Sequence, residues 1–267
     1  MHRQISQWIQ QYVAEYPAAH RLENLWLEPI VAFAATSDPL FQQIRSWTHP
    51  HHLFPEDLLP EAKTVVAYYL PFQPKVSISN ENGLLASPEW GSTYLLTNQL
   101  ITRINDFLVL TLRQSGYLAA YAGATHNFDE SSLMSPWSHR HAAYIAGLGS
   151  FGLHNLLITA QGCCGRLGTL VTSAPAEATP RPEREACLYR YNGSCGLCVS
   201  RCVNGSLHFE DYDRHLCYTM CLKNAQALDS MGLADVCGKC TVQLPCSLTN
   251  PVSETSPVYR PPSSLQS

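Results

Sequence analysis

The chain has 267 residues, a length that allows one or two domains with proper hydrophobic cores. Only 14% of the residues are charged and the formal net charge is −4, so the sequence lacks the basic surface of a general nucleic-acid-binding protein. No apolar run reaches the roughly 18 residues of a membrane-spanning helix. We therefore expect a cytoplasmic protein that binds neither membrane nor nucleic acid, and the sequence leaves its oligomeric state open.

The first part of the chain predicts one helix and two strands. Apolar residues recur at helical spacing over residues 3–16 and predict an amphipathic helix that stops before Pro17. Short apolar runs, rich in β-branched and aromatic residues, predict buried strands at 29–35 and 64–70. Between these strands, three histidines predict a surface loop rather than a metal site, because no cysteine or carboxylate lies at ligand spacing. They are His49, His51 and His52.

The middle of the chain predicts a loop, a long helix and two more strands. Residues 73–91 are rich in glycine, proline and asparagine and predict a long loop. Leucines and other apolar residues over 94–115 follow a helical pattern, and Gly116 is placed to close that helix. Further strands are expected at 153–159 and 168–172, on either side of a turn.

Gly147, Gly149 and Gly152 formally match the G-x-G-x-x-G pattern of dinucleotide sites. That fingerprint needs a strand before it and a helix after it, whereas here residues 141–146 look helical and a strand pattern follows. We interpret the glycines as a tight helix-to-strand turn in which the backbone approaches a ligand.

A cationic cluster precedes this turn. His139, Arg140 and His141 are consecutive, and together they could bind a carboxylate or phosphate and supply protons during a reduction. The alternative, that at least one histidine only caps or packs against a helix, stays open. Arg166 is a further pocket candidate. It follows the adjacent pair Cys163 and Cys164, which we interpret as buried structural thiols because neighbouring cysteines bridge only with strain.

Nine of the eleven cysteines lie between residues 187 and 246. Disulfides would need an oxidising compartment, and the N-terminal sequence carries no basic-then-apolar signal segment. Two CxxC pairs could form one tetrahedral zinc site, but that would leave five cysteines of this segment unused. Iron–sulfur clusters use nearly all of them, because each cubane takes four thiolates.

The bacterial ferredoxin motif assigns three cysteines of one run to one cluster and the fourth to the other cluster. Applied to this spacing, the rule predicts two [4Fe–4S] clusters. The first would be held by Cys187, Cys195, Cys198 and Cys246. The second would be held by Cys202, Cys217, Cys237 and Cys240. Cys221 is left over, one helical turn after Cys217, and could replace a ligand whose spacing departs from the motif.

A segment rich in proline, alanine and glutamate, residues 174–186, separates the cysteines from the rest of the chain. We expect an α+β or α/β protein with an α/β substrate domain at residues 1–178. A small, mostly helical ferredoxin-like domain at 179–250 would follow. Residues 251–267 contain several prolines and predict an extended or disordered tail.

Several stretches in combination resemble the epoxyqueuosine reductase-related family of iron–sulfur proteins, whose double-cluster domain is also similar to that of reductive dehalogenases. The resemblance spans about residues 30 to 250. Its matching stretches are the cysteine array, residues 59–72, residues 146–152 with 156–159, and residues 166–175. It implies two [4Fe–4S] clusters that carry electrons to a pocket between the halves, which in the named reductase holds cobalamin and a tRNA base.

The sequence departs from that reductase at three places. The family's Gly-Lys-Asn is here Gly152-Leu153-His154. The family's acidic proton donor falls near Leu133, with Asp129 and Glu130 out of register. The helical repeats that grip tRNA are replaced by the proline-rich tail. These departures argue against reduction of epoxyqueuosine in tRNA and leave open whether the pocket takes cobalamin, another cofactor or none.

We therefore expect an iron–sulfur oxidoreductase that receives single electrons from an external low-potential donor. It would pass them to a small-molecule substrate or cofactor held by His139, Arg140, His141 and Arg166. The alternatives are a zinc-stapled binding protein and a cobalamin-dependent reductase akin to epoxyqueuosine reductase.

Overall fold

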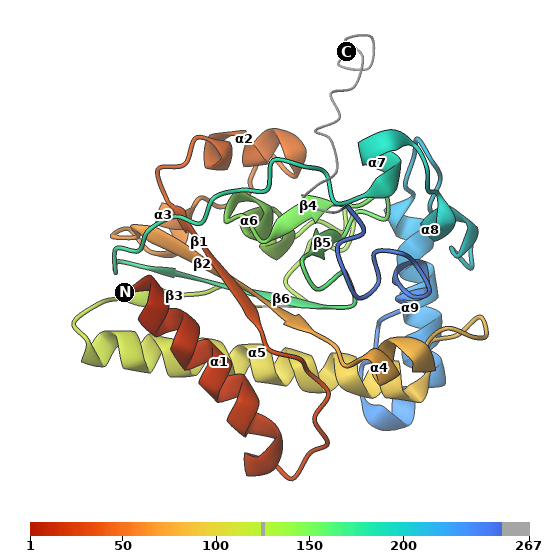
Figure 1. Cartoon of the computed structure of the whole chain (residues 1–267), viewed down its shortest axis with the longest axis horizontal. Helices are drawn as coiled ribbons and strands as arrows, with labels where there is room; N and C mark the ends of the chain where they lie inside the picture. Colours follow the sequence, from red (N-terminus) through yellow and green to blue (C-terminus); the bar gives the residue numbers. More distant parts are fainter. Residues whose placement is uncertain (124–125, 253–267) are drawn as a thin grey trace.

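A four-stranded antiparallel sheet with helices on both faces forms the body of the protein (Figure 1). The computed structural model describes residues 1–123 and 126–252. The strands lie in the order β1 (Ile30–Ala35), β2 (Thr64–Pro71), β6 (Gly165–Thr172) and β3 (Ala119–Ala120). A separate hairpin joins β4 (Gly149–Phe151) to β5 (Leu157–Thr159). The predicted mixture of helices and strands is confirmed, and its sheets are antiparallel.

The helices fall into two sets. Those of the body are α1 (His2–Ala19), α2 (Leu40–Trp47), α3 (Pro55–Leu58), α4 (Pro74–Ser79), α5 (Pro88–Gln114) and α6 (His139–Ile145). Those of the cysteine segment are α7 (Leu188–Asn192), α8 (Leu197–Ser200), α9 (Arg214–Ala227) and the short 3-10 helices η1 (Asp229–Met231) and η2 (Lys239–Thr241). Within the described ranges, no helix has the length and apolar character needed to cross a membrane.

Strand β2 divides the hydrophobic core in two because its side chains alternate between the faces of the sheet. Every residue of β2 is buried. Val66, Tyr68 and Leu70 pack with α1 and α5 on one face, while Val65 and Ala67 pack with α2 and α6 on the other. Figure 1 shows α1 and α5 below the sheet and α2 and α6 above it. Burial on both faces explains why this stretch reads as a continuous apolar run.

The predicted strands at 29–35 and 64–70 and the end of the long helix are confirmed. Helix α5 ends at Gln114, and Gly116 follows with a φ of +83°, a left-handed conformation that favours glycine. The first helix, however, does not stop before Pro17 but continues to Ala19. Pro17 lies in the last turn, so the backbone hydrogen bond that it removes affects only the end of the helix.

The prediction of a single loop over 73–91 is wrong. Helix α4 lies inside it, and α5 begins at Pro88, capped by the Ser87 hydroxyl, which accepts a hydrogen bond from the Trp90 amide at 3.1 Å. Prolines at the first helical positions start both helices instead of breaking them.

Two further sequence expectations need correction. The strand expected at 153–159 begins only at Leu157, because residues 152–155 form a turn, and β6 begins at Gly165, three residues before the expected start. In the histidine loop, His52 is fully buried and accepts a hydrogen bond from the Ser138 amide at 2.8 Å. The tail prediction falls mostly on residues 253–267, which lie outside the described residues.

The cysteine segment packs onto the body through both apolar and polar contacts. Leu228, Ala234 and Val242 join the core that contains α1 and α5. Lys239, only 1% exposed, donates hydrogen bonds from Nζ to the carbonyl oxygens of Asn80 at 2.9 Å and Asn82 at 2.7 Å. The segment is therefore fixed to the loop between α4 and α5. Its division from the body as a separate domain stays a prediction.

Replacing Lys239 with leucine should lower the free energy of unfolding by about 1–3 kcal/mol, because the carbonyls of Asn80 and Asn82 lose a buried donor. Urea denaturation would measure the change. The matched control is Lys223→Leu at an exposed position on α9, which should change stability by less than about 0.5 kcal/mol. Equal effects of the two substitutions would contradict the anchoring role of Lys239.

Candidate metal centre and adjoining cavities

All eleven cysteines are free thiols, so the cysteine array is not a disulfide framework. The predicted ligands fall into two groups, each around its own cavity. We name the set Cys187, Cys195, Cys198 and Cys246 the first cysteine group, and these four residues line a small cavity of about 20 Å³. We name the set Cys202, Cys217, Cys237 and Cys240 the second cysteine group, and these four line a cavity of about 360 Å³. Cys163 and Cys221 also line the second cavity, so the division of the cysteines into two ligand sets stays a prediction.

Local turns bring the thiols of the second cysteine group together. Cys237 and Cys240 flank the start of η2, where Gly238 has a φ of +70°. A Cβ atom at this glycine would lie 2.3 Å from the Trp90 ring, so no larger residue fits. Cys217 faces the same cavity from the first turn of α9. A tight turn therefore supplies Cys237 and Cys240 to the group, and a helix face supplies Cys217.

Cys221, which is not assigned to either predicted cluster, also lines the second cavity, one helical turn after Cys217. A hydrogen bond from the Cys221 thiol lowers the pKa of Cys217 to about 6, with smaller contributions from Tyr212 and Arg140. Burial raises the pKa of Cys240, and the neighbouring thiols of Cys237, Cys217 and Cys202 raise it further. The negative charge of the four thiolates would accordingly need a cationic metal centre to balance it.

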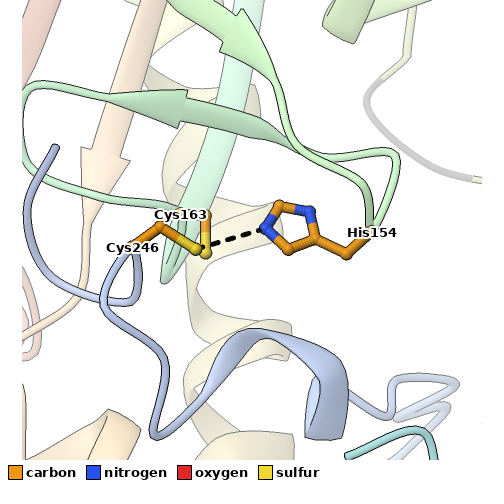
Figure 2. A group of neighbouring side chains, drawn as sticks. All are labelled: His154, Cys163 and Cys246. Atoms are coloured by element: carbon orange, nitrogen blue, oxygen red, sulfur yellow. Dashed lines mark hydrogen bonds between the residues drawn. The ribbon is translucent and has the colours of Figure 1, made fainter. Parts of the chain in front are cut away.

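The first cysteine group has an additional neighbour that sequence analysis did not assign to it. His154, Cys163 and Cys246 place one donor atom each within 4.8 Å of one another (Figure 2). The Cys163 amide donates to the Cys246 carbonyl at 3.0 Å. Hydrogen bonds from Cys163 and then from His154 lower the pKa of Cys246 to about 5. Cys163 and Cys164 are both buried, as expected for structural thiols.

The four predicted pocket residues come together around a third cavity of about 400 Å³, which we name the histidine cavity. His139, Arg140, His141 and Arg166 all line it. Arg140 and Arg166 also line the cavity of the second cysteine group. The two arginines therefore lie between the thiols of the second cysteine group and the histidine cavity.

His139 has both ring nitrogens engaged with the protein. Nδ1 lies 2.8 Å from the Thr169 hydroxyl and Nε2 lies 3.2 Å from the carbonyl oxygen of Gly123. The carbonyl can only accept, so Nε2 carries the proton and Nδ1 accepts from Thr169. Burial, with the nearby Arg166 charge, lowers the pKa of His139 to about 4. The neutral ring is thus held in place, which favours a positioning role.

His141 is also held neutral. Its Nδ1 lies 2.7 Å from the Ser138 hydroxyl, and its ring lies beside those of Trp47 and Phe151. Burial, and then the positive charge of Arg140, lower its pKa to about 4. Of the predicted cluster, the arginines rather than the histidines carry positive charge at neutral pH.

Arg140 and Arg166 are fixed by different contacts. Arg140 donates from Nη1 to the Asn155 carbonyl at 2.5 Å. The Arg166 guanidinium lies 4.4 Å from the centre of the Tyr94 ring, a cation–π contact. The Tyr94 hydroxyl in turn donates to Asp235 at 2.7 Å. Arg166 is therefore oriented by a residue pair that links α5 to the cysteine segment.

A larger cavity of about 840 Å³ opens beside Arg140, and we name it the arginine cavity. Sequence analysis did not find most of its lining. Three arginines face it, namely Arg140, Arg190 and Arg214. Its aromatic residues are Trp47, Phe128, Tyr144, Phe151, Tyr212 and Tyr218. Cationic and aromatic side chains together suit an anionic ligand with a flat ring system.

The turn at residues 129–134 borders this cavity. Leu133, near which the family's proton donor is expected, has a φ of +52° and lines the cavity. The Asp129 carboxylate accepts hydrogen bonds from Ser131 and Ser132, and these bonds lower its pKa to about 2. Arg214 reaches the turn, contacting Met134 and the Ser132 carbonyl. Asp129 is thus an ionised turn residue and has no proton to donate at neutral pH.

The three glycines of the helix-to-strand turn lie beside protein atoms. A Cβ atom at Gly147 would lie 2.9 Å from the Pro180 carbonyl, and one at Gly149 would lie 2.1 Å from the Ile158 carbonyl. At Gly152 it would lie 2.5 Å from the His154 ring. The predicted order of a helix before the turn and a strand after it is confirmed by α6 and β4. Binding of a cofactor by these glycines stays a prediction.

Comparison with models of known protein families finds no match. An epoxyqueuosine reductase of Listeria monocytogenes serovar 1/2a is 28% identical over 178 residues, which are 60% of this chain and 40% of that protein. The chain therefore spans well under two thirds of the curated relative.

Solved structures show the same fold. A selenomethionine-labelled epoxyqueuosine reductase has a TM-score of 0.52 at 15% identity, covering 91% of this chain and 66% of that one. An epoxyqueuosine reductase from Bacillus subtilis has a TM-score of 0.53 at 16% identity, covering 94% and 69%. The resemblance predicted from the sequence motifs is confirmed.

The neutral histidines predict a pH dependence of stability. A histidine with a folded pKa of about 4 and an ordinary value near 6.5 binds more protons when unfolded between these two pH values. Acidification from about pH 7.5 to about pH 5.5 should therefore lower the Tm, and His139→Gln should reduce this fall. Thermal unfolding followed by circular dichroism at both pH values would measure it. An identical fall in the two proteins would contradict a buried, neutral His139.

Proposed function

We propose that this chain, which shares its fold with epoxyqueuosine reductases, is an iron–sulfur reductase. In this proposal two [4Fe–4S] clusters relay single electrons to a ligand in the arginine cavity. The observation that carries it is that four cysteines line one cavity and six line another, and these include all eight predicted ligands. Thiolate sets of four are the ligands that iron–sulfur clusters take, and each cluster would supply one-electron transfer.

The donor chemistry fits the clusters. The ligands in each group are sulfur atoms, and the cysteines are unbridged. Two members of the first cysteine group, Cys187 and Cys198, are less than 10% exposed, which provides the low-dielectric shell that tunes cluster potential. Zinc accepts the same kind of ligand but needs only one set of four for a structural site. Two complete sets therefore favour electron transfer.

The order of electron flow follows from what surrounds each group. The first cysteine group lies beside Leu197, a 47% exposed side chain between two of its ligands, where an external low-potential donor would approach. Cys198 of the first group lies in an apolar cluster against which Cys202 and Cys240 of the second group pack, so the two groups adjoin. The second group shares its cavity with Arg140 and Arg166 and would deliver electrons to the pocket.

The arginine cavity would bind the electron acceptor. Arg140, Arg190 and Arg214 would hold anionic groups, and the aromatic walls would stack on a ring. His141 lines the same cavity and would position these groups as a neutral side chain, and neutral His139 would do so from the adjoining histidine cavity. The proposed acceptor is a small anionic molecule or cofactor, with cobalamin one candidate, and a spectroscopic cobalamin titration separates it from the others. The net charge of −4 argues against an extended nucleic-acid ligand.

Metal analysis tests the proposal directly. Protein purified without air should contain about eight irons per chain and show an absorbance band near 400 nm that dithionite bleaches. A colourless protein with zinc and little iron would overturn the proposal in favour of a zinc-stapled binding protein.

Two cysteines one helical turn apart provide a matched pair of variants. Cys217→Ser should remove about half of the iron, because it takes one thiolate from the second cluster. Cys221→Ser should keep about the full content, because Cys221 is outside both groups of four. Iron analysis and electron paramagnetic resonance of the reduced proteins would measure this. The opposite result would make Cys221 the ligand.

A further inference from the structure

His154 lies in the turn between β4 and β5, and its ring is oriented toward the first cysteine group. The residue is only 5% exposed. The Leu156 amide donates to Nδ1 at 3.1 Å, so in the neutral ring the proton is on Nε2. That nitrogen lies 3.7 Å from Sγ of Cys246, as the dashed line in Figure 2 shows. One backbone contact thus sets the tautomer that makes His154 a hydrogen-bond donor to sulfur.

The turn provides the space for this ring. A Cβ atom at Gly152 would lie 2.5 Å from Cε1 and 2.8 Å from Nε2 of His154, so the ring fills the volume that a side chain at position 152 would need. The Cys246 backbone is held on the opposite side, where its carbonyl accepts from the Cys163 amide at 3.0 Å. The histidine and the sulfur are therefore both fixed before any metal binds.

We propose that His154 is a positioning and tuning residue that donates a hydrogen bond to the Cys246 sulfur and raises the reduction potential of the first cluster. The inference rests on the proposed function. A hydrogen bond to a ligand sulfur withdraws negative charge from it, so the cluster accepts an electron more readily. The step is the transfer of one electron from the external donor to the cluster, with no bond made or broken.

The test compares His154→Phe with His154→Gln. Phenylalanine keeps a ring in the space beside Gly152 but has no N–H, whereas glutamine keeps an N–H donor. His208→Leu, which removes an exposed histidine from the cysteine segment, is the control. Each protein is titrated with dithionite in the presence of mediators, and the reduced clusters are followed by electron paramagnetic resonance.

In His154→Phe, the equilibrium constant for reducing one of the two clusters should fall about tenfold, which is about 59 mV for a one-electron couple. The other cluster should keep its potential. His154→Gln should recover part of the change, and the control should match the wild type. Iron content should stay at the wild-type value in all variants.

Three results would overturn the inference. Unchanged potentials in His154→Phe would mean that the hydrogen bond does not act on the cluster. Loss of about half of the iron in both His154 variants would make His154 a metal ligand rather than a donor to one. If His154→Phe fails to fold, His154→Leu replaces it as the variant without an N–H donor. Equal potentials in His154→Leu and His154→Gln would then mean that the hydrogen bond does not act on the cluster. None of these three results contradicts the proposed function. A wild-type protein without iron would contradict both the proposed function and this inference.

Discussion

The site depends on bringing together thiols from the two ends of the cysteine segment. Cys187 and Cys246 belong to the same group although most of the segment lies between them. Closing such a loop costs conformational entropy, and the cost must be offset by contacts that form in the folded chain. Leu228, Ala234 and Val242 supply apolar burial. Lys239 supplies hydrogen bonds to the body of the protein. The body therefore acts as the template on which the cysteines meet.

The same docking forms the cavities. Arg166 is paired opposite Leu70 in the sheet, so its position is set by the register of β2 and β6. Arg214 comes from the start of α9, and Arg140 comes from α6. Arg214 joins the two arginines of the body around one cavity because the cysteine segment packs against the body. The proposed anion pocket and the proposed metal site thus result from one packing arrangement.

Much of this arrangement can be predicted from the sequence. The features that could not be predicted have identifiable physical reasons. Cysteine spacing predicts two ligand groups because the ligand chemistry restricts spacing strongly, and the members of each predicted group line a common cavity. Buried strands can be predicted because both faces of β2 are covered. Arg190 and Arg214 could not be predicted as pocket residues, since no local pattern marks a side chain that meets its neighbours only after docking. The burial of His52 depends on Ser138, a contact between segments far apart in the sequence. Pro74 and Pro88 indicated a loop where α4 and α5 begin, because proline starts helices as well as ending them.

The two cysteine groups have different surroundings, and this difference gives the proposed electron path its direction. Near the first group, His154 contacts the sulfur of Cys246, and the nearby surface exposes the apolar side chain of Leu197. Near the second group, the cavity is bordered by Arg140 and Arg166, which carry full positive charge. A fixed positive charge stabilises an added electron at longer range than a single hydrogen bond does. The second cluster should therefore attract electrons from the first. The arginines proposed to bind an anionic acceptor would at the same time draw the electrons toward it.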